Sequence, residues 1–264
     1  MKKLSLITAL TAALSVMTLG YAANGGIRRR PLKEQNIALM TYNIRHGEGI
    51  DGITDYGRIA DIIKNSGANI VAMQEIDSVT GRSGGADVLK EIASRTGMHA
   101  TFARAIPFMG GAYGIGIISA EEPMAVTRIP LPGREEARVL LIAEFKDYYI
   151  GCMHLSLTPK DQMASLPIIC REAAKLDKPF IIAGDWNAAP KDKFIKRLKK
   201  YATVLNNTDM PTFPANNPDT LLDYVAAWKK TKAQYKVRQT EFMVIADTVA
   251  SDHRPVFTRI KLSK

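Results

Sequence analysis

Short apolar runs that end on polar or acidic residues recur along this chain, and segments of helical periodicity separate them. Residues 36–43 predict a buried strand, and residues 70–73 predict a second one that ends on Gln74-Glu75. Between them, residues 56–66 carry isoleucines at helical spacing before Gly67, a helix-stop signal. This order predicts a β-α-β unit with two parallel strands.

The same order returns in the middle of the chain. A predicted strand over residues 148–155 contains His154 near its end, and after a helical segment an apolar run ends on Asp185. Asn43 and Glu75 are 32 residues apart, and His154 and Asp185 are 31 apart. Two such units packed face to face would direct these strand ends to one common edge. Coincidence is the alternative, since β-α-β units often have about this length.

The remaining pattern predicts a single α/β domain. Further helices are expected at 86–96 and 160–176 and from Pro190 to about Lys200, and further strands at 101–105, 115–119, 124–129, 138–145, 221–227, 239–245 and 256–261. A long Pro- and Asn-rich loop is expected at 206–219. The predicted fold is a four-layer α/β/β/α sandwich, in which two packed mixed β-sheets carry the helices on their outer faces.

Gly184, Asp185, Trp186 and Asn187 directly follow the apolar run of the second unit. A buried strand that ends in this way delivers a carboxylate and a carboxamide to the rim of a sheet, with Trp186 pointing away into packing. Such a pair can orient a water molecule and hold a phosphoryl oxygen. An Asx turn, in which both side chains bond only the backbone, is the alternative. The repeated β-α-β unit favours the first interpretation, in which both side chains lie at the rim of the sheet.

The beginning of the chain has a different composition. Lys2 and Lys3 precede an uncharged run from Leu4 to Leu19, and small residues follow up to Ala22. This predicts a signal peptide over 1–22, an N-terminal segment over 23–35 and a single folded domain over 36–264. The chain is therefore expected to be exported, to the periplasm or outside the cell, and not to be an integral membrane protein. A membrane anchor is the alternative.

The formal net charge is +10, which suits anionic partners such as nucleic acids. The alternative is that the lysines near residue 196 coat a solvated helix. Two cysteines, Cys152 and Cys170, are too few for a disulfide framework, so two buried thiols are expected, with a disulfide between them as the alternative.

A carboxylate–imidazole pair is predicted near the end of the chain. Asp223 lies within an otherwise apolar strand, where a lone acid is costly unless it is paired. His253, preceded by Asp252, lies just before the last strand and is its natural partner.

At these positions the chain resembles the endonuclease/exonuclease/phosphatase superfamily, and the resemblance covers nearly everything from about Ile37 to the end. The motifs that carry it are Tyr42-Asn43-Ile44-Arg45-His46-Gly47, Gln74-Glu75-Ile76-Asp77, His154-Leu155, Gly184-Asp185-Trp186-Asn187, Leu222-Asp223-Tyr224-Val225 and Ser251-Asp252-His253. Each motif is weak alone, but all six stand in the family's order and spacing.

The resemblance implies a hydrolase that attacks a phosphoester with an activated water. Glu75 matches the family's metal-binding glutamate, with Asn43 beside it, and Asp252 would support the metal or the base. The metal implied is Mg²⁺, with Mn²⁺ as a further option, because such ions need few protein carboxylates.

The catalytic roles implied are divided between the two strand ends and the last motif. Asp185 matches the residue that orients or deprotonates water, and Asn187 would hold that water or a phosphoryl oxygen. His253 would donate to the phosphate or act as the base, with Asp223 fixing its tautomer. His154 and Arg138 would contact the phosphate from the opposite side.

The function expected is an exported, divalent-metal-dependent phosphodiesterase or phosphatase. Its substrate would be a nucleic acid, a lipid head group or a small phosphate ester, and no obligate protein partner is expected. A secreted nuclease is the first alternative, and a catalytically silent binding protein with the same fold is the second. Each inference rests on the site residues, because a fold does not determine a function.

Overall fold

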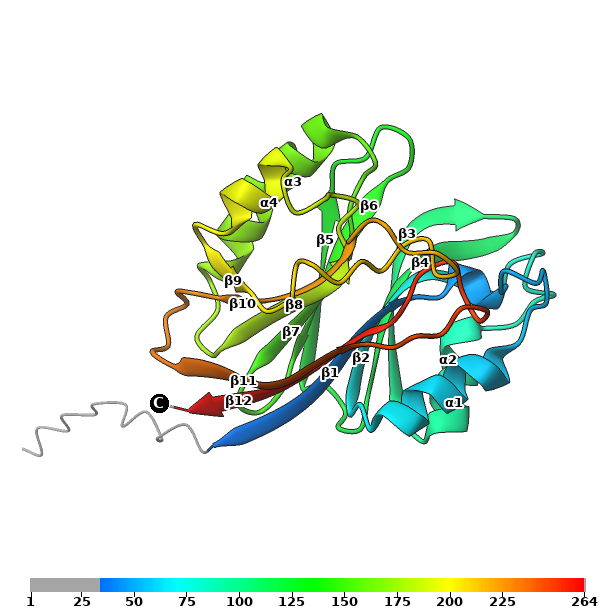
Figure 1. Ribbon diagram of the computed structural model, residues 1–264, viewed down its shortest axis with the longest axis horizontal. Helices are drawn as coiled ribbons and strands as arrows, with labels where there is room; N and C mark the ends of the chain where they lie inside the picture. Colours follow the sequence, from blue (N-terminus) through cyan, green and yellow to red (C-terminus); the bar gives the residue numbers. More distant parts are fainter. Residues whose placement is uncertain (1–33, 264) are drawn as a thin grey trace, which may run out of the picture. The chain divides into compact units, whose positions relative to one another are not determined.

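Two six-stranded mixed sheets pack face to face and carry helices on their outer faces (Figure 1). The structure is a computed structural model that describes residues 34–263. The predicted signal peptide, 1–22, and most of the segment 23–35 lie outside these residues. The four-layer sandwich predicted from the sequence is confirmed.

The two sheets have nearly the same arrangement of strands. The first sheet runs β11 (Lys236–Val244), β12 (Val256–Ser263), β1 (Gln35–Asn43), β2 (Ile70–Ser78), β4 (Gly111–Ser119), β3 (His99–Phe108). The second runs β5 (Ala125–Leu131), β6 (Arg138–Glu144), β7 (Tyr149–His154), β8 (Phe180–Asp185), β10 (Asp223–Trp228), β9 (Ala202–Val204). Each sheet has one parallel pair at its centre, β1–β2 and β7–β8, and antiparallel pairs elsewhere.

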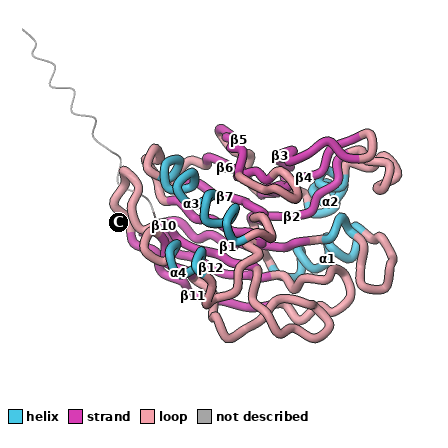
Figure 2. The backbone as a smooth tube through the Cα atoms, turned by 90° about the horizontal axis from the view of Figure 1, so that it is seen from above, coloured by secondary structure: helices cyan, strands magenta, loops and turns pink. Residues whose placement is uncertain are grey.

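The helices complete the outer layers. The first sheet is covered by α1 (Tyr56–Ser66) and α2 (Val88–Thr96), and the second by α3 (Pro159–Ala173) and α4 (Lys193–Leu198); a 3-10 turn, η1 (Arg45–Gly47), follows β1 (Figures 1 and 2). Asp55 caps α1 by accepting from the backbone N–H of Gly57 at 2.7 Å, and Gly67 ends it in the left-handed region at φ 68°. Among residues 34–263, no helix is long and apolar enough to cross a bilayer.

Alternation along the central strands distributes the apolar side chains among three cores. On β1, Ile37 and Leu39 point between the two sheets, whereas Met40 and Tyr42 pack beneath the helices. The middle core contains only side chains from strands and their connections, and each outer core joins one sheet to its helices. Both faces of the central strands β1, β2, β7, β8 and β10 are therefore buried.

The strand registers confirm the repeated β-α-β unit. Asn43 pairs with Gln74 across β1 and β2, and His154 pairs with Asp185 across β7 and β8. On the other side of β8, Asp223 pairs with Asp185. We call this shared edge, where β1, β2, β7 and β8 end and β10 begins, the catalytic rim.

Several predicted strands are wrong in extent, and one strand was not predicted. The second strand was expected to end at Gln74-Glu75, but β2 continues to Ser78 after a register shift between Met73 and Ile76. Two polar residues interrupt the apolar run there, so the pattern indicated a strand end although the backbone only bulges. The short strand β9 was not predicted, because three residues are too few to show a period.

The two cysteines are free thiols, so the disulfide alternative is wrong. Cys152 lies in the core between the sheets, whereas Cys170 packs with the core beneath α3. The second sheet separates them. Cys170 is half-buried rather than fully buried as expected.

Candidate active site

Asp185 ends β8 at the centre of the catalytic rim and is 1% exposed. Gly184 before it has φ 152°, and a Cβ there would meet the carbonyl oxygen of Met153 at 1.9 Å. Only glycine lets β7 and β8 approach so closely. The glycine therefore fixes where the carboxylate leaves the strand.

The two oxygens of the Asp185 carboxylate have different surroundings. Oδ1 accepts from the backbone N–H of Asn187 at 2.9 Å. Oδ2 accepts from Nδ2 of Asn43 at 3.1 Å and lies 3.5 Å and 3.7 Å from Nε2 of His154 and His253. Burial raises the pKa of Asp185 to about 7, although His253 opposes the shift. A carboxylate with such a pKa can accept a proton near neutral pH.

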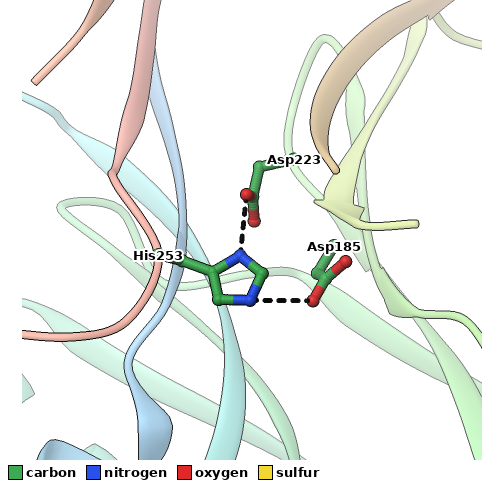
Figure 3. A group of neighbouring side chains, drawn as sticks. All are labelled: Asp185, Asp223 and His253. Atoms are coloured by element: carbon green, nitrogen blue, oxygen red, sulfur yellow. Dashed lines mark hydrogen bonds and ion pairs between the residues drawn. The ribbon is translucent and has the colours of Figure 1, made fainter. Parts of the chain in front are cut away.

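His253 lies between two acids (Figure 3). Its Nδ1 is 2.9 Å from Oδ2 of Asp223, and its Nε2 faces Asp185. Burial alone would lower the pKa of His253, but the carboxylates of Asp223 and Asp185 raise this pKa to about 10. The ring is therefore an imidazolium at neutral pH, held by Asp223 in one orientation.

His154 is held from behind by Arg138. The Nη1 atom of Arg138 is 3.1 Å from Nδ1 of His154 and 3.1 Å from a carboxylate oxygen of Glu136. Because a guanidinium only donates, Nδ1 of His154 accepts, and the ring hydrogen is on Nε2, which faces the rim. Burial and Arg138 lower the pKa of His154 well below its usual value, so this imidazole is neutral.

Glu75 lies in the β2 bulge with φ 60°, a conformation that few residues other than glycine adopt. Its side chain accepts from Nδ2 of Asn43 at 3.0 Å and is only half-buried. Asn43 thus bridges Glu75 and Asp185 and connects the two sheets at the rim. To offer its amide oxygen to a cation, Asn43 would have to turn its side chain, since Oδ1 now accepts from the N–H of Arg45.

Asp252 and Ser251 lie beside the end of β1. The Ser251 hydroxyl donates to the carbonyl of Asn43 at 2.8 Å and lies 3.3 Å from Oδ1 of Asp252. The half-buried Asp252 carboxylate adds to the negative potential that raises the pKa of His253. The structure thus brings the last motif to the rim.

Asn187 and Trp186 diverge as predicted. Asn187 has φ 47°, and its Nδ2 donates to the carbonyl of Leu155 at 3.0 Å. Trp186 is fully buried and stacks on Tyr224, with ring centroids 4.7 Å apart. The Asx-turn alternative describes the N–H of Asn187 on Asp185 and the hydrogen bond of the Asn187 side chain to the backbone. It does not describe the contacts of Asp185 with the side chains of Asn43, His154 and His253.

Loop residues near the rim are mostly engaged with one another. Arg45 and His46 lie 3.4 Å and 3.6 Å from the carboxylate of Glu48. Tyr113 lines a small cavity with Arg138 and His154. None of these contacts identifies a chemical group of the substrate that would bind here.

Two contributors could not be predicted from the pattern. The Thr212 hydroxyl donates to Oδ2 of Asp223 at 2.6 Å, and the ring of Phe213 packs 4.8 Å from that of His253. Both lie in the Pro- and Asn-rich loop predicted at 206–219, and they pack behind His253. The only sequence signal was the Pro-Thr-Phe-Pro run, which indicates a rigid turn without specifying its contacts.

Several groups here offer ligands to a cation. Asp185, Asp223 and His253 have ligand atoms within 4.8 Å of one another. However, His253 is already paired through Nδ1 with Asp223, and as an imidazolium it would repel a cation. Glu75, with no Lys or Arg partner among the described residues, is the better candidate.

The profile of the endonuclease/exonuclease/phosphatase family matches residues 40–253. The chain belongs to this family. Its members are phosphoester hydrolases that generally use a divalent metal. Among curated proteins, none matches the chain in sequence.

Solved structures of family members share the fold. An endonuclease/exonuclease/phosphatase from Bacteroides vulgatus has a TM-score of 0.70 at 16% identity, covering 87% of this chain and 100% of its own. One from Beutenbergia cavernae has 0.67 at 20% identity, covering 87% and 72%. A mannosyl-6-phosphatase from Bacteroides thetaiotaomicron has 0.66 at 15% identity, covering 86% and 100%. At these low sequence identities, the structural similarity establishes the fold but not the function.

Proposed function

We propose that this chain is a divalent-metal-dependent phosphoester hydrolase for a small phosphorylated substrate. The observation that carries the proposal is the buried Asp185 carboxylate at the rim, surrounded by Asn43, Asn187, His154 and His253. Burying such a group costs free energy that packing alone does not require. This cost is explained if the carboxylate accepts a proton from a bound water molecule.

Glu75 and Asp252 fit a hard cation, with Mg²⁺ the first candidate and Mn²⁺ the second. Four acids, Glu75, Asp185, Asp223 and Asp252, lie at the rim with one imidazolium, so the site has excess negative charge. When bound, the cation would supply positive charge to the non-bridging oxygens of the phosphoryl group. Asn43 would orient Glu75 toward it.

The remaining residues divide the reaction among them. Asp185 accepts the proton of the attacking water, and Asn187 positions that water or a phosphoryl oxygen. His253 stays protonated and stabilises the charge that develops on the phosphoryl oxygens. His154 donates a hydrogen bond from Nε2 to the same group, and Arg138 fixes the tautomer that makes this possible.

The charge of the rim supports a small substrate rather than a nucleic acid. The loops that follow or precede rim strand ends carry nine Asp and Glu but only four Lys and Arg, over residues 44–55, 79–87, 155–158, 186–192, 209–222 and 245–255. Proteins hold nucleic acids largely through Lys and Arg contacts to phosphates. The charge of these loops therefore does not support the nuclease alternative. A small phosphomonoester, the type of substrate named for the mannosyl-6-phosphatase, is compatible with the rim.

Export remains part of the proposal and rests on the sequence of residues 1–22. Protease accessibility of the protein in intact and permeabilised cells of its source would test it. Protection in both would contradict export.

Hydrolysis of a phosphomonoester, a phosphodiester and DNA, with Mg²⁺, Mn²⁺ or EDTA, tests the function. We expect EDTA-sensitive hydrolysis of a small ester that is lost in Asp185→Asn. Asp209→Asn, in an exposed rim loop, is the matched control and should retain it. Activity that survives EDTA or Asp185→Asn would contradict the proposal, and a lack of both hydrolysis and metal binding would favour the silent binding protein.

A further inference from the structure

Two segments of the described domain give it its largest local excess of positive over negative charge. Residues 193–208 and 224–240 together contain ten Lys and Arg and no Asp or Glu. The other residues between 34 and 263 contain 19 Lys and Arg and 26 Asp and Glu. The domain is therefore strongly polarised, with an acidic remainder and a basic part.

The structure brings these two segments together. Lys229 donates to the carbonyl of Lys199 at 2.5 Å, and its N–H bonds the carbonyl of Tyr201 at 2.8 Å. Tyr235 bonds the carbonyl of Trp228, which holds the start of β11 against the end of β10. We define the basic edge as the exposed lysines of this region, Lys196, Lys199, Lys200, Lys229, Lys230 and Lys236. Within residues 34–263 none of these six forms an ion pair.

The basic edge lies at the opposite end of the strands from the catalytic rim. Asp223 begins β10 at the rim, and Lys229 follows its last residue. Six residues of strand span about 20 Å. Since the Debye length is about 8 Å at physiological ionic strength, these lysines are screened from a phosphate held at the rim. They therefore do not serve to attract the substrate.

We propose that the basic edge docks the protein on an anionic lipid surface, with the catalytic rim facing the solution. Clustered lysines near an anionic bilayer act additively as point charges, without requiring a shaped pocket. Eight of the ten basic residues in the two segments are lysines, whereas fixed phosphate recognition favours the forked guanidinium of Arg.

Aromatic side chains also favour a lipid surface over a nucleic acid. Tyr201 is the one exposed aromatic side chain in the described segments 193–208 and 224–240, and it stacks on the buried Trp228. A nucleic-acid strand would need a row of exposed aromatics for base stacking. One amphipathic ring beside lysines suits a lipid interface.

The beginning of the described chain lies at the same edge. Gln35 starts β1 opposite Leu262, and Lys236 starts β11 opposite Ser263. In sequence, Arg28, Arg29, Arg30 and Lys33 directly precede this point.

Sedimentation of the full chain with lipid vesicles tests this proposal. We expect binding to vesicles of phosphatidylcholine mixed with phosphatidylglycerol, weak binding to phosphatidylcholine alone, and release by salt. Each lysine at such a surface contributes roughly five-fold in affinity, so Lys200→Gln with Lys230→Gln should lower it roughly 25-fold. Neither side chain makes a described hydrogen bond, so the fold should be retained.

Lys64→Gln with Lys90→Gln, on α1 and α2, removes the same charge elsewhere and should leave vesicle binding unchanged. Equal losses in both double variants would contradict a localised docking surface, as would equal binding to neutral and anionic vesicles. Preference for DNA over anionic vesicles would also overturn it. Hydrolysis of a soluble ester by the Lys200→Gln, Lys230→Gln protein should be unchanged, which separates docking from the proposed function.

Discussion

The two β-α-β units of the rim have the same topology but present their acids differently. In the first unit, a bulge at positive φ places Glu75 in a half-buried position, where its one described partner is Asn43. In the second, a glycine holds Asp185 in a buried position between two imidazoles. The first arrangement suits a hydrated cation and the second suits proton transfer. Burial, rather than strand topology, differentiates the chemistry of the two acids.

The largest effect is expected from Asp185→Asn. The amide keeps the shape but cannot accept a proton, so kcat should fall by roughly 10²- to 10⁴-fold. Steady-state kinetics on a small phosphoester would measure this. Unchanged kcat would remove the proposed distinction between the units.

Glu75→Gln should act through the metal. The neutral side chain binds a hard cation weakly, so activity at low Mg²⁺ should fall by on the order of 100-fold, with partial recovery at high Mg²⁺. A Mg²⁺ titration of the rate would show this. A loss that no metal concentration relieves would indicate a different role for Glu75.

The imidazolium of His253, which faces Asp185, should govern the pH dependence of stability. His253 has a folded-state pKa of about 10 against 6.5 when unfolded, so its contribution is full below pH 6.5 and is lost as the pH rises toward 10. The free energy of unfolding of the metal-free protein should fall across that range. In His253→Gln this fall should be reduced, and an identical pH dependence would contradict an imidazolium at this position.

Thr212→Val should have the smallest effect. It removes the hydroxyl that donates to Asp223, and a net hydrogen bond is worth about 1 kcal/mol, so kcat should fall roughly five-fold. The pKa of His253, followed by NMR, should change with it. Thr220→Val, whose hydroxyl bonds only the exposed Asp219, is the control and should leave both quantities unchanged.

Much of this arrangement was predictable because periodic patterns fix strand ends. The similar spacing of the two units, 32 and 31 residues, predicted that Asn43, Glu75, His154 and Asp185 meet, and the registers confirm the strands that carry them. The pairing of Asp223 with His253 followed from the cost of a lone buried acid.

The features that could not be predicted depend on contacts that no periodic sequence pattern reveals. The bulge at Glu75 looked like a strand end, and Thr212 lies in an irregular loop whose path depends on tertiary packing. The position of Arg138 behind His154, with Glu136, also depends on side-chain geometry that spacing does not specify. The basic edge was visible only as a run of lysines until the structure joined two segments.

Metal binding by the two acid variants tests the division between the units most directly. Isothermal titration calorimetry with Mn²⁺ on the wild type, Glu75→Gln and Asp185→Asn would separate the two acids. We predict that Glu75→Gln loses most of the affinity, whereas Asp185→Asn retains the metal and loses turnover. Loss of metal in Asp185→Asn together with wild-type affinity in Glu75→Gln would contradict the account.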